Sequence, residues 1–239
     1  MFRFFRIRKD LEFIIHIGPH RTGSRFIQRT LRRNQPLYAD KATYLGWKDP
    51  LVLPVQKLML QSRNTKLAKQ NAPNIKTAML DLTSQLETGR YVISCEDFLG
   101  RLPMRWNISG LYPNANITLK AMVQGLLKGS VKLTVCLYER EYEDWLQSVY
   151  YRRHEDAPTT GASHQELLEQ FGLPPGWSDF HARVLEATKG ANLRIFSFEE
   201  DRDSGIFGKS LFQEIGVTNC QLLNWDFSAN QNASKTRPR

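Results

Sequence analysis

A segment near the start of the chain has the residue types and spacing of an anion-binding loop. Residues 13–28 read FIIHIGPHRTGSRFIQ, an apolar run followed by a glycine-containing loop and a helical pattern. Backbone N–H groups point outward at a helix start, and the helix dipole favours an anion there. Gly23 permits close approach of a ligand, while Thr22 and Ser24 add hydroxyl groups and Arg21 adds a fixed positive charge. These residues predict a phosphate-binding loop, and a tight strand-to-helix turn with incidental basic residues is the alternative.

The spacing of the two loop glycines is that of a nucleotide-binding P-loop. Four residues separate Gly18 from Gly23, as in the Walker A motif. Ser24 and Arg25 follow, where a Walker A motif needs Lys and then Ser or Thr. The missing lysine disfavours an ATPase or a kinase.

A second cluster could hold another anion. Residues 131–153 read VKLTVCLYEREYEDWLQSVYYRR, a predicted buried strand followed by a helix. Arg140 follows the strand, and Ser148 lies about two turns into the helix, on the face that also carries Trp145 and Arg152. A guanidinium and a hydroxyl placed in this way could converge on one phosphate group. The alternative is a strand and a helix joined by a loop with exposed charges.

A third cluster supplies candidates for a general base. The apolar run 91–95 ends in Glu96 and Asp97, and a carboxylate at a strand end could accept the proton of a substrate hydroxyl. Glu96 is the first candidate for the base and His20 the second, against the alternative of structural loop residues. His16 lies inside the first predicted strand, where a packed core histidine is expected.

These clusters require a scaffold in which strands end at a common edge. Apolar runs predict strands at 13–18, 91–95, 131–138 and 193–198. Helices are predicted at 24–34, 53–69, 75–87, 117–128 (capped by Asn116), 141–153, 178–189 (capped by Ser178) and 206–215. Such alternation predicts an α/β fold with a central parallel sheet flanked by helices, a P-loop-like arrangement of three layers. Ligands of such sheets bind beyond the carboxyl ends of the strands.

The loop HIGPHRTGSRFIQ resembles the phosphosulfate-binding loop of sulfotransferases, which use 3′-phosphoadenosine-5′-phosphosulfate as donor. Bacterial and carbohydrate members of that family typically read H-x-G-x-x-K-T-G-[TS]-[TR]-x-x-Q, and Arg21 stands where they usually carry Lys. The family also has an Arg at a strand end and a Ser eight residues later, both on the donor's 3′-phosphate, and Arg140 and Ser148 have this spacing. The resemblance spans roughly residues 12–234.

The resemblance implies transfer of a sulfuryl group from this donor to an acceptor hydroxyl, with a carbohydrate or glycolipid expected as acceptor. It implies catalytic roles for Arg21, Glu96 and His20. It implies donor contacts from Pro19, His20, Arg21, Thr22, Gly23, Ser24, Arg25, Arg140 and Ser148. No metal is expected to take part. A P-loop nucleotide phosphotransferase and a non-catalytic nucleotide-binding homologue remain alternatives.

Composition agrees with a globular chain that meets an anionic partner. The chain has 239 residues and 33 Lys and Arg against 24 Asp and Glu, a net charge of +9. We expect one domain over residues 1–239, with a loose tail after about 226. The basic residues look dispersed along the sequence, so a nucleic-acid partner is not expected.

The remaining sequence features concern the cellular compartment of the protein and the binding of the acceptor. Three widely spaced cysteines disfavour a disulfide framework, and no apolar run is long enough for a membrane span. We therefore expect a cytoplasmic protein, with peripheral contact to a membrane surface left open. Residues that could contact a sugar are Tyr44, Trp47, Trp106, Trp177 and the basic run 152–154.

Overall fold

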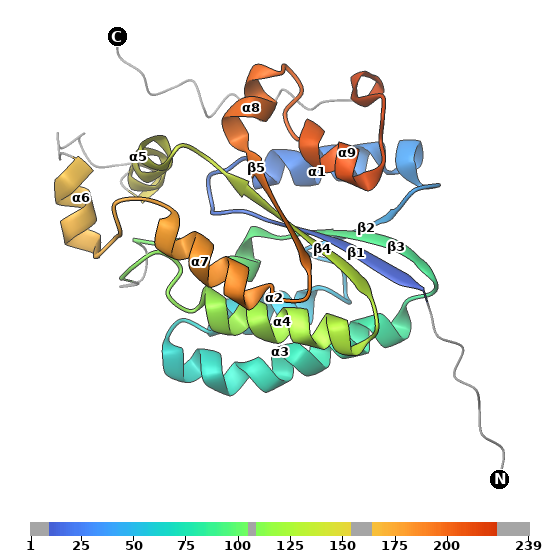
Figure 1. Ribbon diagram of the computed structural model, residues 1–239, viewed down its shortest axis with the longest axis horizontal. Coiled ribbons are helices and arrows are strands. Elements are labelled where there is room, and N and C mark those ends of the chain that lie inside the picture. Colours follow the sequence, from blue (N-terminus) through green and yellow to red (C-terminus); the bar gives the residue numbers. More distant parts are fainter. Residues whose placement is uncertain (1–9, 105–108, 154–163, 224–239) are drawn as a thin grey trace.

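A sheet of five parallel strands forms the middle layer of the protein (Figure 1). The computed structural model describes residues 10–104, 109–153 and 164–223. The order of the strands across the sheet is β2-β3-β1-β4-β5. The strands are β1 (Leu11–Ile17), β2 (Thr43–Gly46), β3 (Gly89–Ser94), β4 (Lys132–Glu139) and β5 (Asn192–Ser197). Because β3, β1 and β4 are neighbours, the segments that follow them meet at one edge of the sheet.

Helices cover both faces of the sheet, so the predicted P-loop-like three-layer α/β fold is confirmed (Figure 1). One side carries α2 (Leu53–Gln61), α3 (Thr65–Gln85), α4 (Ala115–Lys128) and α7 (Ser178–Ala187). The other side carries α1 (Ser24–Tyr38), α8 (Phe198–Asp203) and α9 (Lys209–Ile215). The remaining described elements are η1 (Glu96–Leu99), α5 (Tyr142–Arg153), α6 (His164–Phe171) and η2 (Cys220–Leu222).

The central strands are mostly apolar in their middle because both of their faces are buried there. Phe13 and Ile15 of β1 point into the larger apolar cluster, which includes residues of α3 and α4. Ile14 points into the smaller cluster beneath α1 and α9. The edge strand β5 is different, since Ile195 is 49% exposed. The strands with buried middles are those that carry the candidate site at their ends.

Several predicted helix limits were wrong. The predicted helix 53–69 is two helices, because Asn64 begins a new one by accepting a hydrogen bond from the backbone N–H of Leu67. The predicted helix 75–87 is the second half of α3. The short strand β2 and the helices α6 and α8 were not predicted from the sequence.

Two predicted caps were also wrong. Asn116 lies inside α4, and Asn114 occupies the N-cap position without a side-chain cap. Ser178 is the first residue of α7, which has Trp177 at its N-cap position. None of the helices in the described ranges combines the length and the apolar character needed to cross a bilayer.

Candidate active site

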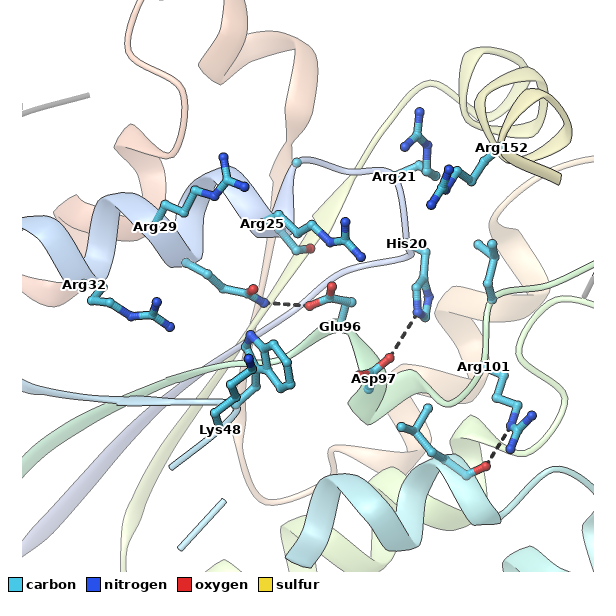
Figure 2. A pocket seen from close by; sticks show the side chains of 16 residues that line it. His20, Arg21, Arg25, Arg29, Arg32, Lys48, Glu96, Asp97, Arg101 and Arg152 are labelled. Carbon is cyan, nitrogen blue, oxygen red and sulfur yellow. Dashed lines mark hydrogen bonds and ion pairs between the residues drawn. The ribbon is translucent and has the colours of Figure 1, made fainter. Parts of the chain in front are cut away.

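A cavity of about 700 Å³ opens at the carboxyl ends of β1 and β3 (Figure 2). The loop between β1 and α1 contributes His20, Arg21 and Gly23 to its wall, and η1 contributes Glu96 and Asp97. The structure thus brings the predicted anion loop and the predicted base to one cavity. Its volume is in the range of about 300–1,000 Å³ that small-molecule sites usually have.

The loop is held closed by its own threonine. Thr22 is fully buried, and its hydroxyl donates to the carbonyl oxygen of Pro19 at 2.7 Å. A Cβ atom on Gly18 would lie 2.7 Å from the Oγ1 atom of Thr22. The Thr22 hydroxyl, predicted from the sequence to face a ligand, is therefore used inside the loop.

Gly23 is required by the backbone and by a neighbouring ring. Its φ angle is +78°, in the left-handed region, and a Cβ atom there would lie 2.4 Å from the ring of Phe207. From the sequence, this glycine was expected to allow close approach of a ligand. The backbone conformation and the ring of Phe207 already require it in the protein alone. Arg21 has the same φ of 78° without being glycine, an uncommon conformation for an arginine.

The start of α1 offers unsatisfied donors to an anion. The first N–H groups of a helix have no partner inside the helix, and α1 has neither a side-chain cap nor an acidic residue in its first turn. The Oγ atom of Ser24 is buried and has no hydrogen-bond partner within the described part of the chain. A phosphate or phosphosulfate oxygen would satisfy these groups and gain from the helix dipole.

Helix α5 positions the loop from the other side. The Nε atom of Arg21 donates to the Oγ atom of Ser148 at 3.0 Å, and the indole N–H of Trp145 donates to the carbonyl oxygen of His20 at 2.8 Å. Ser148 was predicted to act with Arg140, but the described contacts join it to Arg21. Arg21 therefore belongs both to the cavity wall and to the contact with α5.

Arg140 lies after β4, as predicted, but it does not line the described cavity. Its guanidinium carbon is 5.1 Å from the ring centroid of Phe198. Its Nη2 atom is 3.7 Å from Asp144, and its Nε atom is 3.9 Å from the Oε1 atom of Glu199. That Nε and that Oε1 are both buried without a hydrogen bond in the described residues. Arg140 therefore lies between two carboxylates, and its buried Nε atom faces that of Glu199.

Glu96 presents one carboxylate oxygen to the cavity (Figure 2). Its Oε2 atom accepts a hydrogen bond of 2.6 Å from the side-chain amide of Gln28, which is itself buried on α1. Gln28 also donates to the carbonyl oxygen of Ser94 at 3.4 Å. The Oε1 atom of Glu96 has no partner among the described residues. A carboxylate fixed at one oxygen and open at the other has the geometry of a general base.

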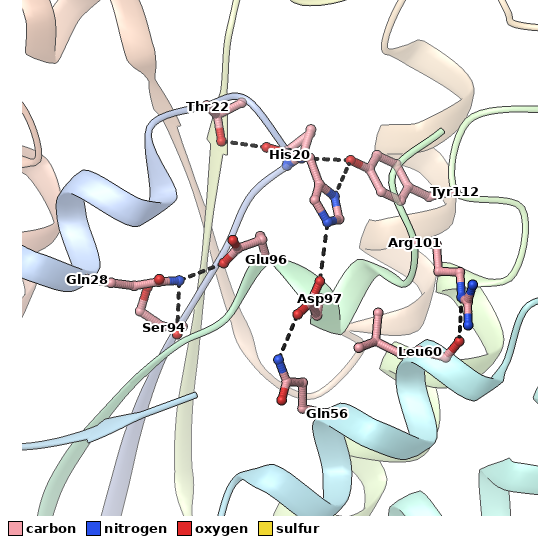
Figure 3. Close-up of polar contacts among 11 residues, drawn as sticks. His20, Thr22, Gln28, Gln56, Leu60, Ser94, Glu96, Asp97, Arg101 and Tyr112 are labelled. Atoms are coloured by element: carbon pink, nitrogen blue, oxygen red, sulfur yellow. Dashed lines mark hydrogen bonds and ion pairs between the residues drawn. The ribbon is translucent and has the colours of Figure 1, made fainter. Parts of the chain in front are cut away.

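Both ring nitrogens of His20 are already engaged (Figure 3). The hydroxyl of Tyr112 accepts from the backbone N–H of His20 at 2.7 Å and lies 3.0 Å from Nδ1. Since a hydroxyl has a single hydrogen, it can donate that hydrogen to Nδ1. Nε2 then carries the ring proton toward Asp97, 3.3 Å away. In this tautomer His20 has no free nitrogen for a substrate, so the geometry favours Glu96 as the base.

Asp97 is held as an anion beneath His20. Burial raises its pKa, but hydrogen bonds from His20 and Gln56 and the charge of Arg25 outweigh that effect, so the pKa of Asp97 lies below its usual value. The amide of Gln56 donates to its Oδ2 atom at 2.7 Å. The charged Asp97 therefore fixes the orientation of the imidazole.

His16 is the core histidine that the sequence predicted. It is fully buried, and its Nδ1 atom lies 2.7 Å from the hydroxyl of Ser94. Burial lowers the pKa of His16 to about 3, so this ring is neutral at physiological pH.

Sequence reasoning missed the residues that hold the catalytic candidates in place. Tyr112 and Gln56 come from segments without a motif, and only the tertiary fold brings them to His20 and Asp97. Gln28 was noticed as part of the loop motif but not as the partner of Glu96. The motif spacing contains no signal for these contacts, because each joins elements far apart in the chain.

The predicted acceptor residues divide into two groups. Trp47 lines the cavity. Trp177 instead packs on Tyr142 and Trp145 and donates its indole N–H to the carbonyl oxygen of Arg140. Trp106, His154 and the tail after 226 lie outside the described residues.

Comparison with known proteins yields weak structural similarities. No protein-family model and no curated protein sequence matches the chain. A solved structure titled "Crystal structure of APE1195" is similar with a TM-score of 0.41 and 11% identity, over 89% of this chain and 98% of that one. The PezAT toxin–antitoxin system of Streptococcus pneumoniae gives a TM-score of 0.34 and 12% identity, over 88% of this chain and 80% of that one. Both values are too low to support a functional argument, so the function is inferred from the site itself.

Proposed function

We propose that the protein is a sulfotransferase that moves a sulfuryl group from 3′-phosphoadenosine-5′-phosphosulfate to a hydroxyl group of a carbohydrate. One observation carries the proposal. The anion-ready start of α1, with the buried and unpartnered Ser24 hydroxyl, shares one cavity with the open carboxylate oxygen of Glu96. The resemblance of the loop to the phosphosulfate-binding loop of sulfotransferases supports this choice of donor.

The donor's anionic groups find matching partners on both sides of the loop. The amides at the start of α1 and the Ser24 hydroxyl suit the 5′-phosphosulfate. We assign the 3′-phosphate to the guanidinium of Arg140, whose present contacts with Asp144 and Glu199 the phosphate would replace. The bond of Arg21 to Ser148 holds a further cation between the loop and α5. Pro19 and Thr22 contribute by shaping the loop.

The residues divide the chemistry into proton removal and charge stabilisation. Glu96 takes the proton of the acceptor hydroxyl at its open Oε1 atom while that hydroxyl oxygen forms a bond to sulfur. The bond between sulfur and the bridging oxygen of the donor breaks, and negative charge develops on the leaving phosphate. Arg21 stabilises this charge, and stabilisation that grows toward the transition state lowers the barrier.

An acceptor screen with isotopically labelled donor tests the proposal. Purified protein is incubated with the donor and a panel of saccharides, and products are read by mass spectrometry in the presence of a chelator. The proposal requires a product heavier by one sulfuryl group whose formation persists without divalent metal. A phosphorylated product that depends on ATP and magnesium would instead identify a P-loop phosphotransferase and refute the proposal.

A further inference from the structure

The cavity wall has far more positive than negative charge. Seven cationic side chains line it among the described residues, against two carboxylates. The cations are Arg21, Arg25, Arg29, Arg32, Lys48, Arg101 and Arg152. The two carboxylates, Glu96 and Asp97, are both already hydrogen bonded inside the protein. The basic residues look dispersed along the sequence, but the fold gathers seven of the described ones here.

Three of these cations form a row on one helix. Arg25, Arg29 and Arg32 are spaced four and three residues apart on α1, so they lie on one face and extend over about 10 Å of the helix axis. Each is exposed, and none forms an ion pair with another described residue. Like charges at this spacing destabilise a helix, and a cation in the first turn also opposes the helix dipole. The row therefore costs stability in the free protein, and a bound polyanion would relieve that cost.

Among the described residues, four further cations line the same cavity from outside α1 (Figure 2). Lys48 follows β2 and lies 4.8 Å from the ring centroid of Trp47, and Arg101 lies on the segment after η1. The cations thus come from several elements around one cavity. A single phosphate group could contact only one or two of these cations, whereas an extended ligand with several anionic groups could contact most of them.

On the basis of the function proposed above, we infer that the acceptor is an acidic oligosaccharide, one that carries uronate or sulfate groups beside the hydroxyl that Glu96 deprotonates. A saccharide supplies hydroxyl groups next to its anionic groups, as the position of Glu96 requires. Single-stranded nucleic acids usually bind to several aromatic side chains that stack on successive bases. Trp47 is the one tryptophan, tyrosine or phenylalanine among the described residues of the wall, so a nucleic acid fits less well.

Binding of an oligogalacturonate to the protein without donor tests this inference. Titration calorimetry compares it with a neutral malto-oligosaccharide of the same length and with an oligothymidylate of equal net charge. The acidic saccharide should bind, more weakly as salt is added, and the other two should bind at least about tenfold more weakly. Equal binding of the oligothymidylate, or of the neutral saccharide, would overturn the inference.

A neighbouring arginine of α1 that does not line the cavity provides the control. The double variant Arg29→Gln/Arg32→Gln should weaken oligogalacturonate binding at least about tenfold, the result of losing charge-assisted contacts. Arg33→Gln, on an exposed neighbouring residue outside the cavity wall, should change it less than about twofold. Equal effects of both variants would contradict the assigned row.

A donor-product arm separates this inference from the proposed function. Addition of 3′-phosphoadenosine-5′-phosphate should not displace the oligogalacturonate, and both variants should keep their stabilisation by this nucleotide. Displacement would assign the row to the donor and overturn the inference. If the nucleotide fails to stabilise any of the proteins while the saccharide still binds, the proposed function fails and the polyanion site stands.

Discussion

At the scale of single residues, the structure distinguishes the two candidates for the base, the carboxylate of Glu96 and the imidazole of His20. Gln28 holds one oxygen of Glu96 and leaves the other open, whereas Tyr112 and Asp97 occupy both nitrogens of His20. The two candidates that the sequence left open for the base are therefore no longer equivalent in geometry. The residues that make this distinction are buried polar side chains outside the motifs.

Replacement of Glu96 tests its role as base. Glu96→Gln keeps the shape of the side chain but removes the proton acceptor, so turnover should fall by about 10²-fold or more. Binding of the donor product should be unchanged, because Glu96 acts on the acceptor. Steady-state kinetics with any working acceptor measures the effect, with Glu143→Gln, an exposed acid of α5, as the control. Normal turnover in Glu96→Gln would return the assignment of the base to His20.

Arg21 provides the second test at this scale. Arg21→Ala should lower turnover by about 10²-fold, comparable to the loss of one oxyanion donor, with a smaller effect on donor affinity. Arg21→Lys, which introduces the residue usual in the sulfotransferase loop, should retain activity. Steady-state kinetics that give kcat and the KM for the donor separately, measured for both variants, decide the matter. If both variants turn over like the wild type, Arg21 is only a surface charge on a tight turn.

At the scale of elements, the loop between β1 and α1 depends on its glycine. Gly23→Ala places a side chain at a φ of +78° and against the ring of Phe207. The left-handed conformation alone costs about 1–2 kcal/mol, and the ring contact adds to this loss of stability. Gly216→Ala, in the same left-handed region with a φ of 99° and a ψ of 15° and no atom nearer than 3.7 Å to its Cβ position, isolates the conformational part. Urea unfolding should show a larger loss for Gly23→Ala, and equal losses would disprove the contact with Phe207.

The elements that could be predicted from the sequence are those with a clear local pattern of apolar residues. Buried strands such as β1 and β4 are recognisable in the sequence as largely apolar runs. Their alternation with helices along the chain predicts a parallel sheet. The four-residue strand β2 has no such run. The break between α2 and α3 depends on the cap at Asn64, which a window of helical spacing overlooks.

The candidate site was predictable only in its motifs. The loop and Glu96 could be found because the chemistry requires particular residue types at strand ends. The pairing of Ser148 with Arg21, and of Arg140 with Asp144 and Glu199, depends on side-chain directions that spacing leaves open. The contact of Tyr112 with His20 crosses 92 positions of the chain and has no signal in the sequence.

At the scale of the whole molecule, His16 links stability to pH. Its pKa is about 3 in the folded protein, below its usual value, because burial disfavours the charged ring. The stability that depends on the neutral ring is complete above the unfolded pKa of about 6.5 and is lost as the pH falls toward 3. Between about pH 7 and pH 5 the wild type should lose more stability than His16→Gln, by up to about 1.4 kcal/mol per pH unit. Chemical unfolding at both pH values measures this, and parallel losses would contradict the assignment.

The central claim is that the protein recognises a donor with both a 5′- and a 3′-phosphate group, and thermal unfolding with nucleotides tests it most directly. Binding to the native state raises the unfolding temperature, and the stabilisation grows with the logarithm of ligand concentration divided by Kd. The account predicts a clear stabilisation by 3′-phosphoadenosine-5′-phosphate and a much smaller one by ATP or adenosine 5′-phosphosulfate, which lack the 3′-phosphate. It also predicts that Arg140→Ala reduces the first effect, since this variant loses about 1.5–3 kcal/mol of binding free energy from a charge-assisted contact. Equal stabilisation by all three nucleotides, or none by the first, would contradict the account.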